Sequence, residues 1–199
     1  MIDDRFREVL PRFVGPLLGL YRAVGLTPNG VSILGFVTAL GAAALIVVGQ
    51  PLVAIAVWWL SRLFDGTDGI YARHSGQTSA FGAYLDIVLD MAAYSAIVLA
   101  LARVHPDLSA EWLWVVFLYV LCITSALALG EQEARLDVPP RDDRGLRLGA
   151  GLAEGGETGI AYTLFLLFPS WIAPLVWVWI VILATTVVAR TVLAHRHLR

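Results

Sequence analysis

The hydrophobic and polar positions of the chain divide it into long apolar stretches separated by short polar segments. Six of these stretches, with their flanks, approach the roughly 20 apolar residues that a helix needs to cross a bilayer. Because an open sheet leaves backbone groups without partners in lipid, helices are the expected structure. The pattern therefore predicts an all-α integral membrane protein with six transmembrane helices, in a single domain over residues 1–199. The expected spans cover roughly residues 30–48, 51–73, 79–104, 109–131, 157–169 and 171–192.

Residues 3–24 show a different pattern, in which apolar side chains recur at helical spacing and charged side chains occupy the positions between them. This pattern predicts an N-terminal amphipathic helix that lies in the membrane interface before the first span. A solvated cytoplasmic helix is the alternative. The first ten residues, MIDDRFREVL, are too charged for a cleavable signal peptide, so we expect none.

The composition agrees with a membrane protein. The 199 residues are 58% hydrophobic and 15% charged, whereas soluble domains average about 45–50% apolar and about 25% charged residues. All 14 basic residues are arginines, and a six-span chain with its N-terminus inside places 12 of them on the inner side, with Arg103 outside and Arg62 within a span. This bias predicts a multi-pass protein of the cell inner (plasma) membrane, with both termini and the polar loop 131–158 in the cytoplasm.

Four aspartates between residues 65 and 90 do not fit the apolar pattern. Asp65 and Asp68 stand three residues apart, and Asp86 and Asp90 stand four apart, so the members of each pair share a helix face. The link 74–79 between the two helices is short, which makes the helices neighbours. We therefore expect both carboxylate stripes to face one cavity at the cytoplasmic ends of these helices.

Four carboxylates in such a cavity would repel one another and would be costly to remove from water. Arg62 and Arg73 are the nearby cations in sequence and offset only part of this charge. A pair of divalent cations would balance it; carboxylate oxygens suit Mg²⁺, Mn²⁺ or Ca²⁺ rather than zinc, and such a pair is a usual clamp in phosphoryl transfer. Small residues on the same faces (Gly69, Ala72 and Gly82) would let a diphosphate approach the backbone. Aspartates that only cap helix ends are the alternative, which explains one or two of them but not two matched stripes.

The same residues resemble the signature of the CDP-alcohol phosphotransferase family. The signature residues of this chain are Asp65, Asp68, Gly69, Ala72, Arg73, Gly82, Asp86 and Asp90, which match the family at every fixed position. The segment Thr27-Pro28-Asn29 and the layout of six spans after an amphipathic helix are also similar to the family. The resemblance covers roughly residues 1–130 well and the last third only in topology.

Members of this family transfer a phosphate-linked group from a CDP-linked donor to an alcohol and release CMP. The resemblance therefore implies a membrane transferase of phospholipid biosynthesis, with CDP-diacylglycerol or another CDP-alcohol as donor and an alcohol as acceptor. It also implies two divalent cations, Mg²⁺ or Mn²⁺, with Ca²⁺ as a non-productive substitute. As partners it implies membrane lipids and a second copy in a homodimer, with no nucleic acid. The arginine bias and the span layout place the active site on the cytoplasmic side.

The resemblance also implies roles for individual residues. The implied metal ligands are Asp65, Asp68, Asp86 and Asp90. Asp90 would complete this set or act as the catalytic base on the acceptor hydroxyl, because it lies deepest along its helix and a less hydrated carboxylate is a stronger base. The implied nucleotide pocket consists of Asn29, Gly69, Ala72, Arg73, Thr78, Ser79 and Gly82. Arg73 would neutralise a phosphate oxygen, while Asn29 and Thr78 would either donate hydrogen bonds or only cap helices.

These residues leave the acceptor alcohol open. The arginines of the polar loop (Arg135, Arg141, Arg144 and Arg147) would either hold a phosphorylated acceptor, such as glycerol 3-phosphate or inositol phosphate, or anchor the loop at anionic headgroups. Glycerophosphate-using members usually carry a lysine-rich stretch near this place, and this chain has no lysine. Glu154 and Glu157 stand three residues apart and would favour a neutral or cationic alcohol if they face the cavity; the alternative is that they cap the fifth span.

Two further alternatives concern Arg62 and the class of protein. Arg62 stands one turn before Asp65 and would either pair with a carboxylate or extend toward the interface. A cation transporter or channel whose path is lined by the aspartates is the alternative function. The carboxylates lie at one end of two adjacent helices rather than across the bilayer, which argues against a transport path.

Overall fold

The structure is a computed structural model of the chain that describes residues 14–136 and 155–198. These residues fold almost entirely into helices, and none of them lies in a strand, which confirms the all-α class. The α-helices are α2 (Gly15–Ala23), α3 (Pro28–Val47), α4 (Pro51–Ser75), α5 (Ala80–Val104), α6 (Ser109–Arg135), α7 (Gly155–Leu167) and α8 (Ile172–His197), with 3₁₀ turns η1 (Pro106–Leu108) and η2 (Pro169–Trp171). The six apolar ranges of the sequence coincide with α3 to α8.

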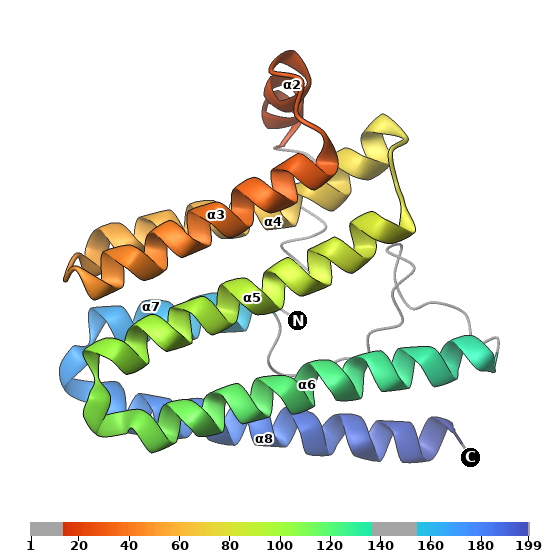
Figure 1. Ribbon diagram of the computed structural model, residues 1–199. Helices are drawn as coiled ribbons and strands as arrows, with labels where there is room; N and C mark the ends of the chain where they lie inside the picture. Colours follow the sequence, from red (N-terminus) through yellow and green to blue (C-terminus); the bar gives the residue numbers. More distant parts are fainter. Residues whose placement is uncertain (1–13, 137–154, 199) are drawn as a thin grey trace.

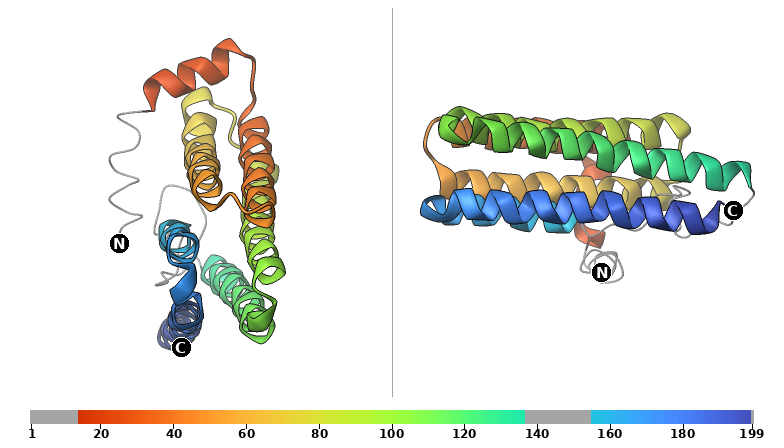
Figure 2. Two further views of the ribbon diagram at one scale, coloured as in Figure 1. Left: turned by 90° about the vertical axis from the view of Figure 1, so that its left-hand side faces the viewer. Right: turned by 90° about the horizontal axis from the view of Figure 1, so that it is seen from below.

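Helices α3 to α8 run lengthwise beside one another, and α2 lies crosswise above α3 and α4 at one edge of the bundle (Figure 1). Helix α3 packs against both α4 and α5, and α6 packs against α8. The view along the bundle in Figure 2 shows α2 crossing above α4. Helix α3, which carries Asn29, is therefore the direct neighbour of both helices that carry the signature residues.

Four helical segments are long and apolar enough to cross a membrane: Pro28–Val47, Ala80–Val104, Pro106–Arg135 and Pro169–His197. Helix α4 has 25 residues but carries several charged side chains, and α7 has 13 residues. Large apolar side chains cover the outer surface of the bundle, as in Leu99 and Leu113, which are 66% and 71% exposed. Apolar residues on all sides of a helix are typical of a membrane span.

The expected interfacial helix falls partly outside the described residues, which begin at residue 14. Its remaining part forms α2, where Leu18 and Tyr21 are buried and Leu20 is 55% exposed. The Tyr21 hydroxyl lies 3.0 Å from the Thr67 hydroxyl of α4, and the Tyr71 hydroxyl of α4 donates a hydrogen bond to the carbonyl of Leu26. These contacts fix α2 to α4 close to the aspartates.

Local residue chemistry sets where the helices near the aspartates begin and end. Thr27 caps α3 by accepting a hydrogen bond from the Gly30 amide at 3.1 Å, and Pro28 follows at the first helical position. Ser79 caps α5 in the same way through the Gly82 amide at 3.0 Å. Helix α4 ends at Ser75, and the residue that caps it is Gly76, whose φ of 68° favours glycine. The link between α4 and α5 is therefore as short as the sequence predicts.

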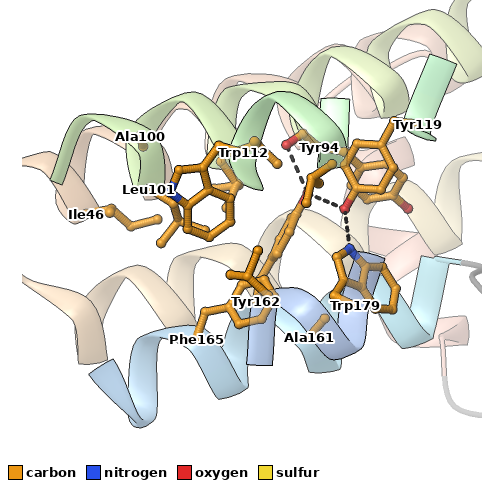
Figure 3. Packing of buried hydrophobic residues seen from close by; sticks show 14 of the residues in the cluster. Ile46, Tyr94, Ala100, Leu101, Trp112, Tyr119, Ala161, Tyr162, Phe165 and Trp179 are labelled. Atoms are coloured by element: carbon orange, nitrogen blue, oxygen red, sulfur yellow. Dashed lines mark hydrogen bonds between the residues drawn. The ribbon is translucent and has the colours of Figure 1, made fainter. Parts of the chain in front are cut away.

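The core on the α5–α8 side contains a hydrogen-bonded group of aromatic side chains (Figure 3). The Tyr119 and Tyr162 hydroxyls lie 2.8 Å apart, and the Trp179 indole donates to the Tyr119 hydroxyl at 3.1 Å. The Tyr162 hydroxyl also donates to the backbone carbonyl of Tyr94 at 3.0 Å. Because buried polar groups are costly without partners, these bonds fix the packing of α5 to α8 around one point.

Candidate active site

A pocket opens where the N-terminal ends of α3 and α5 meet the C-terminal half of α4, and it has a volume of about 130 Å³. Its lining contains all the residues assigned from the sequence to a nucleotide pocket, together with two of the four aspartates, Asp68 and Asp86. The full lining is Pro28, Asn29, Ser32, Asp68, Gly69, Ala72, Arg73, Gln77, Thr78, Ser79, Gly82, Ala83 and Asp86. Helical spacing and one short link therefore bring these side chains together from three helices.

Glycine makes the close approach of α3 to α5 at this pocket possible. A Cβ atom at Gly82 would lie 3.1 Å from the Asn29 Oδ1 atom and 3.1 Å from the Ser79 Oγ atom. A Cβ atom at Gly69 would lie 3.4 Å from the Arg73 guanidinium. The space beside Gly82 thus exists only because this residue has no side chain.

The helix caps narrow the roles of Asn29 and Thr78. Thr27 and Ser79 are the capping residues of α3 and α5, so Asn29 and Thr78 do not serve as caps. Both side chains line the pocket instead. Ser79 has two roles, because it caps α5 and also lines the pocket.

Asp68 is the most buried of the four aspartates, with 5% of the residue exposed. Its carboxylate accepts a short hydrogen bond from the Ser32 hydroxyl of α3 and a bond from the Gly69 amide at 2.5 Å. Sequence reasoning missed Ser32. The signal was its spacing, because Ser32 stands three residues after Asn29 and so occupies the same face of α3 one turn later.

Asp65 and Asp90 face a different partner, the guanidinium group of Arg62. Arg62 Nη1 lies 3.5 Å from Asp65 Oδ2 and makes a close ion pair with Asp90 Oδ1. The Arg62 side chain is 9% exposed and lies over the rings of Trp58 and Tyr94. The alternative in which Arg62 extends toward the interface is therefore wrong, because two carboxylates and two aromatic rings hold its charge inside the bundle.

The four aspartates have different immediate partners, although their charges lie close enough to act on one another. Asp68 and Asp86 line the pocket, whereas Asp65 and Asp90 meet at Arg62. Within residues 14–136 and 155–198, no three His, Cys, Asp or Glu side chains stand in an arrangement ready for a metal ion. In this arrangement Ser32 holds the Asp68 carboxylate, and Arg62 holds those of Asp65 and Asp90.

The residues considered for the acceptor lie elsewhere. Glu157, near the start of α7, borders a separate, largely apolar groove of about 210 Å³ between α7 and α8, and its Oε2 atom is buried without a hydrogen-bond partner. Arg135 is exposed and pairs with Glu131 one turn before it, at 2.9 Å. Arg141, Arg144, Arg147 and Glu154 lie outside the described residues.

Comparison with known proteins gives a family match over most of the chain. A family model described as CDP-alcohol phosphatidyltransferase matches residues 25–189. The "Inner membrane protein YnjF" of Escherichia coli (strain K12) is 34% identical over 152 residues, which are 75% of this chain and 73% of that protein. The phosphatidylinositol phosphate synthase of Mycobacterium tuberculosis (strain ATCC 25618 / H37Rv) is 39% identical over 93 residues, which are 46% of this chain and 42% of the synthase.

Solved structures agree with this match. The crystal structure of Mycobacterium tuberculosis phosphatidylinositol phosphate synthase (PgsA1) with CDP-DAG bound has a TM-score of 0.68 and 26% sequence identity, and covers 92% of this chain and 94% of that chain. The structure of the same synthase in complex with manganese and citrate has a TM-score of 0.65 and 25% identity, over 92% of this chain and 88% of that chain. The similarity to the solved structures thus extends over both halves of the bundle.

Proposed function

The chain belongs to the CDP-alcohol phosphatidyltransferase family, and we propose that its donor is CDP-diacylglycerol and that the reaction takes place in the pocket between α3, α4 and α5. It is a transferase that moves a substituted phosphate group to an alcohol and releases CMP. The CDP-DAG bound to a synthase of the same fold supports the donor. The family match gives no support to the alternative of a cation transporter.

The single observation that carries the proposal is the composition of the pocket. Asn29 and Thr78 are hydrogen-bonding groups at its wall, and Arg73 offers a planar cation suited to phosphate oxygens. Gly69 and Gly82 leave the backbone accessible on two sides, which a bulky diphosphate requires. Asp68 and Asp86 border the same space and provide hard anionic oxygens.

Divalent cations fit this donor set. The site contains carboxylates with no thiolate or imidazole among the pocket residues, and such oxygen ligands suit Mg²⁺ or Mn²⁺. We assign ligation of a pair of ions to Asp65, Asp68, Asp86 and Asp90, with Ca²⁺ as a non-productive substitute; a synthase of the same fold crystallised with manganese supports a divalent ion. When bound, the ions would polarise the diphosphate and offset charge on the leaving CMP.

Asp90 is the proposed base. It lies on α5 one turn beyond Asp86, away from the pocket lining, and 28% of its side chain is exposed. In the reaction the acceptor oxygen forms a bond to the phosphorus of the phosphatidyl group, and the bond from this phosphorus to the CMP oxygen breaks. The proton of the acceptor hydroxyl passes to the Asp90 carboxylate, which is the function of a general base.

Several alcohols, phosphorylated and neutral, are candidates for the acceptor. The sequence match to the mycobacterial synthase covers less than half of either chain, so inositol phosphate, the acceptor that its name suggests, is one candidate among several. Glu157 borders the apolar groove between α7 and α8 and does not line the aspartate pocket, so it gives no argument against a phosphorylated acceptor at that pocket. A direct comparison of phosphorylated and neutral alcohols decides between them.

The membrane arrangement follows from the same assignment. We place α4 and α7 across the membrane beside the four apolar segments, which makes six spans, with α2 as the end of an interfacial helix. The arginine bias supports cytoplasmic termini and a cytoplasmic active site in the inner membrane. The similarity to an inner membrane protein supports this location. The family resemblance also supports a homodimer, which the molecular mass in detergent would test.

The test of the function is CMP release by the purified protein. The protein, in nanodiscs with CDP-diacylglycerol and Mn²⁺ or Mg²⁺, is given glycerol 3-phosphate, inositol phosphate, inositol or serine in parallel reactions. We expect CMP to appear with one acceptor and a matching phospholipid to form. Absence of CMP with every acceptor and both metals, from a protein that binds CDP-diacylglycerol, would contradict the proposed donor reaction.

A further inference from the structure

Arg62 is the charged group closest to the aspartates that the reaction above leaves without a role. It stands on α4 one turn before Asp65 and contacts Asp65 and Asp90, so it connects α4 to α5 inside the bundle. It is 9% exposed, and its charge cannot be removed by deprotonation in a protein. A permanent positive charge therefore lies between two of the four carboxylates.

The surroundings of Arg62 hold it in one position. Its guanidinium carbon lies 4.5 Å from the centre of the Trp58 ring and 5.1 Å from that of the Tyr94 ring. Nη2 donates to the Ser61 hydroxyl at 3.1 Å, and Nη1 donates to the Tyr94 hydroxyl at 3.4 Å. Aromatic rings next to a guanidinium attract it electrostatically and exclude water from it. The side chain is thus fixed by contacts on several sides, unlike an exposed arginine.

Tyr94 connects this position to the rest of the core. Its backbone carbonyl accepts the hydrogen bond from Tyr162, and its ring packs on Trp58 at 5.9 Å between centres. A Cβ atom at Gly155, the first residue of α7, would lie 3.1 Å from the Tyr94 hydroxyl. The ring therefore has little room to move, and Arg62 is packed against a rigid part of the bundle.

From this geometry we propose that Arg62 is a positioning residue: it fixes the direction of the Asp90 carboxylate and competes with divalent cations for Asp65 and Asp90. The inference rests on the proposed function, which assigns these carboxylates to metal ligation and base catalysis. A guanidinium beside a carboxylate and a dication at the same carboxylate repel each other as like charges. Arg62 therefore weakens metal binding at Asp65 and Asp90, so that the Asp90 carboxylate stays available as the base. Asp68 and Asp86 are then the stronger metal ligands.

The test measures Mn²⁺ binding in the absence of substrate, by electron paramagnetic resonance or calorimetry, and then CMP release. Arg62→Gln removes the charge, and Arg62→Lys keeps it without the planar group. Arg103→Gln, at the opposite end of α5 and exposed, is the matched control for the loss of one arginine. Each variant is first checked for a monodisperse profile and an unchanged helical content in detergent.

We expect Arg62→Gln to bind Mn²⁺ roughly tenfold more tightly, because a like charge near the metal is removed. Its kcat should fall about 10–100-fold, as when a residue that orients a reacting group is lost, with little change in KM for CDP-diacylglycerol. Arg62→Lys should keep the wild-type Mn²⁺ affinity and show a smaller loss of kcat. Arg103→Gln should match the wild type in both measurements.

Two results would overturn the inference. Unchanged or weaker Mn²⁺ binding by Arg62→Gln would show that Arg62 does not compete with the metal, since a residue that only supports the ligands loosens binding when it is lost. If Arg62→Gln does not fold, the lysine variant is used instead. Weakened Mn²⁺ binding by Arg62→Lys would then show that Arg62 supports the metal ligands and does not compete with the metal. Failure of the wild-type protein to release CMP would contradict the proposed function, while the comparison of Mn²⁺ affinities would still decide the competition.

Discussion

The Ser32 hydroxyl of α3 donates a hydrogen bond to the Asp68 carboxylate of α4, 36 residues away in sequence. Asp68 is almost fully buried and also accepts the bond from the Gly69 amide. A buried carboxylate needs such donors, because it has left the water that would otherwise solvate it. The contact therefore joins two helices and sets the direction of the carboxylate at the pocket wall.

Replacing Ser32 with alanine should impair the enzyme without unfolding it. A hydrogen bond to a charged group contributes about 1.5–3 kcal/mol, so loss of the Asp68 orientation should lower kcat/KM for CDP-diacylglycerol roughly tenfold or more. Initial rates of CMP release measure this. The matched control is Ser95→Ala, because the Ser95 hydroxyl bonds only to the carbonyl of Met91 in its own helix. Equal rates for the Ser32 and Ser95 variants would contradict a role for the Ser32–Asp68 bond.

Gly82→Ala should weaken binding of the CDP-linked donor without unfolding the protein. The new methyl group would lie 3.1 Å from both Asn29 Oδ1 and Ser79 Oγ, so the wall of the pocket must shift. We expect KM for CDP-diacylglycerol to rise and CMP binding to weaken, as measured by calorimetry. At Gly41, the nearest atom to an added Cβ is a Val57 methyl at 3.9 Å, so Gly41→Ala is the control and should leave CMP binding unchanged. Normal CMP affinity in the Gly82 variant would place the nucleotide elsewhere.

Tyr162→Phe tests the aromatic group in the core. The change removes hydrogen bonds to the Tyr119 hydroxyl and the Tyr94 carbonyl, and leaves buried polar atoms with fewer partners. Such losses cost about 1–3 kcal/mol, so the thermal unfolding midpoint in detergent should fall. Tyr84→Phe, at a tyrosine that is 61% exposed, should leave the midpoint unchanged. An equal midpoint for the two variants would mean that the Tyr162 bonds add nothing to stability.

Much of the site follows from helical spacing. The positions of Asp68, Gly69 and Ala72 on α4 and of Gly82 and Asp86 on α5 are enough to predict one pocket, because the link between the helices is short. The same reasoning predicts that the six apolar ranges form helices, since an open sheet would leave backbone groups without partners in lipid. These inferences need only local geometry and the solvent.

The orientation of Arg62 and the contribution of Ser32 could not be predicted in this way. Helix α3 is apolar on nearly every side, so its sequence does not say which face meets α4. The direction of Arg62 depends on Trp58 and on Tyr94 of the next helix, and a tryptophan in an apolar stretch gives no sign of such a role. The different partners of the aspartates are a result of tertiary contacts with both side chains.

Removal of divalent cations should abolish activity reversibly. Treatment with EDTA followed by dialysis should stop CMP release, because it removes the cations whose positive charge offsets the diphosphate. Mn²⁺ or Mg²⁺ should restore the rate, and Ca²⁺ should bind without restoring it. Circular dichroism before and after chelation provides the control for folding. Full activity in the chelated protein would contradict the metal assignment of Asp65, Asp68, Asp86 and Asp90.

Asp90→Asn should separate chemistry from binding. The amide keeps the size of the side chain but cannot accept the acceptor proton, and loss of a general base typically costs roughly 10²–10⁴-fold in rate. Asp90 does not line the nucleotide pocket, so CMP binding should stay within about twofold of the wild type, a margin well below 1.4 kcal/mol. Asp107→Asn, in the η1 turn at the far end of α5, is the control for removing one carboxylate. A normal rate in the Asp90 variant would exclude it as the base, whereas a lost rate with lost CMP binding would instead indicate that Asp90 acts through metal ligation.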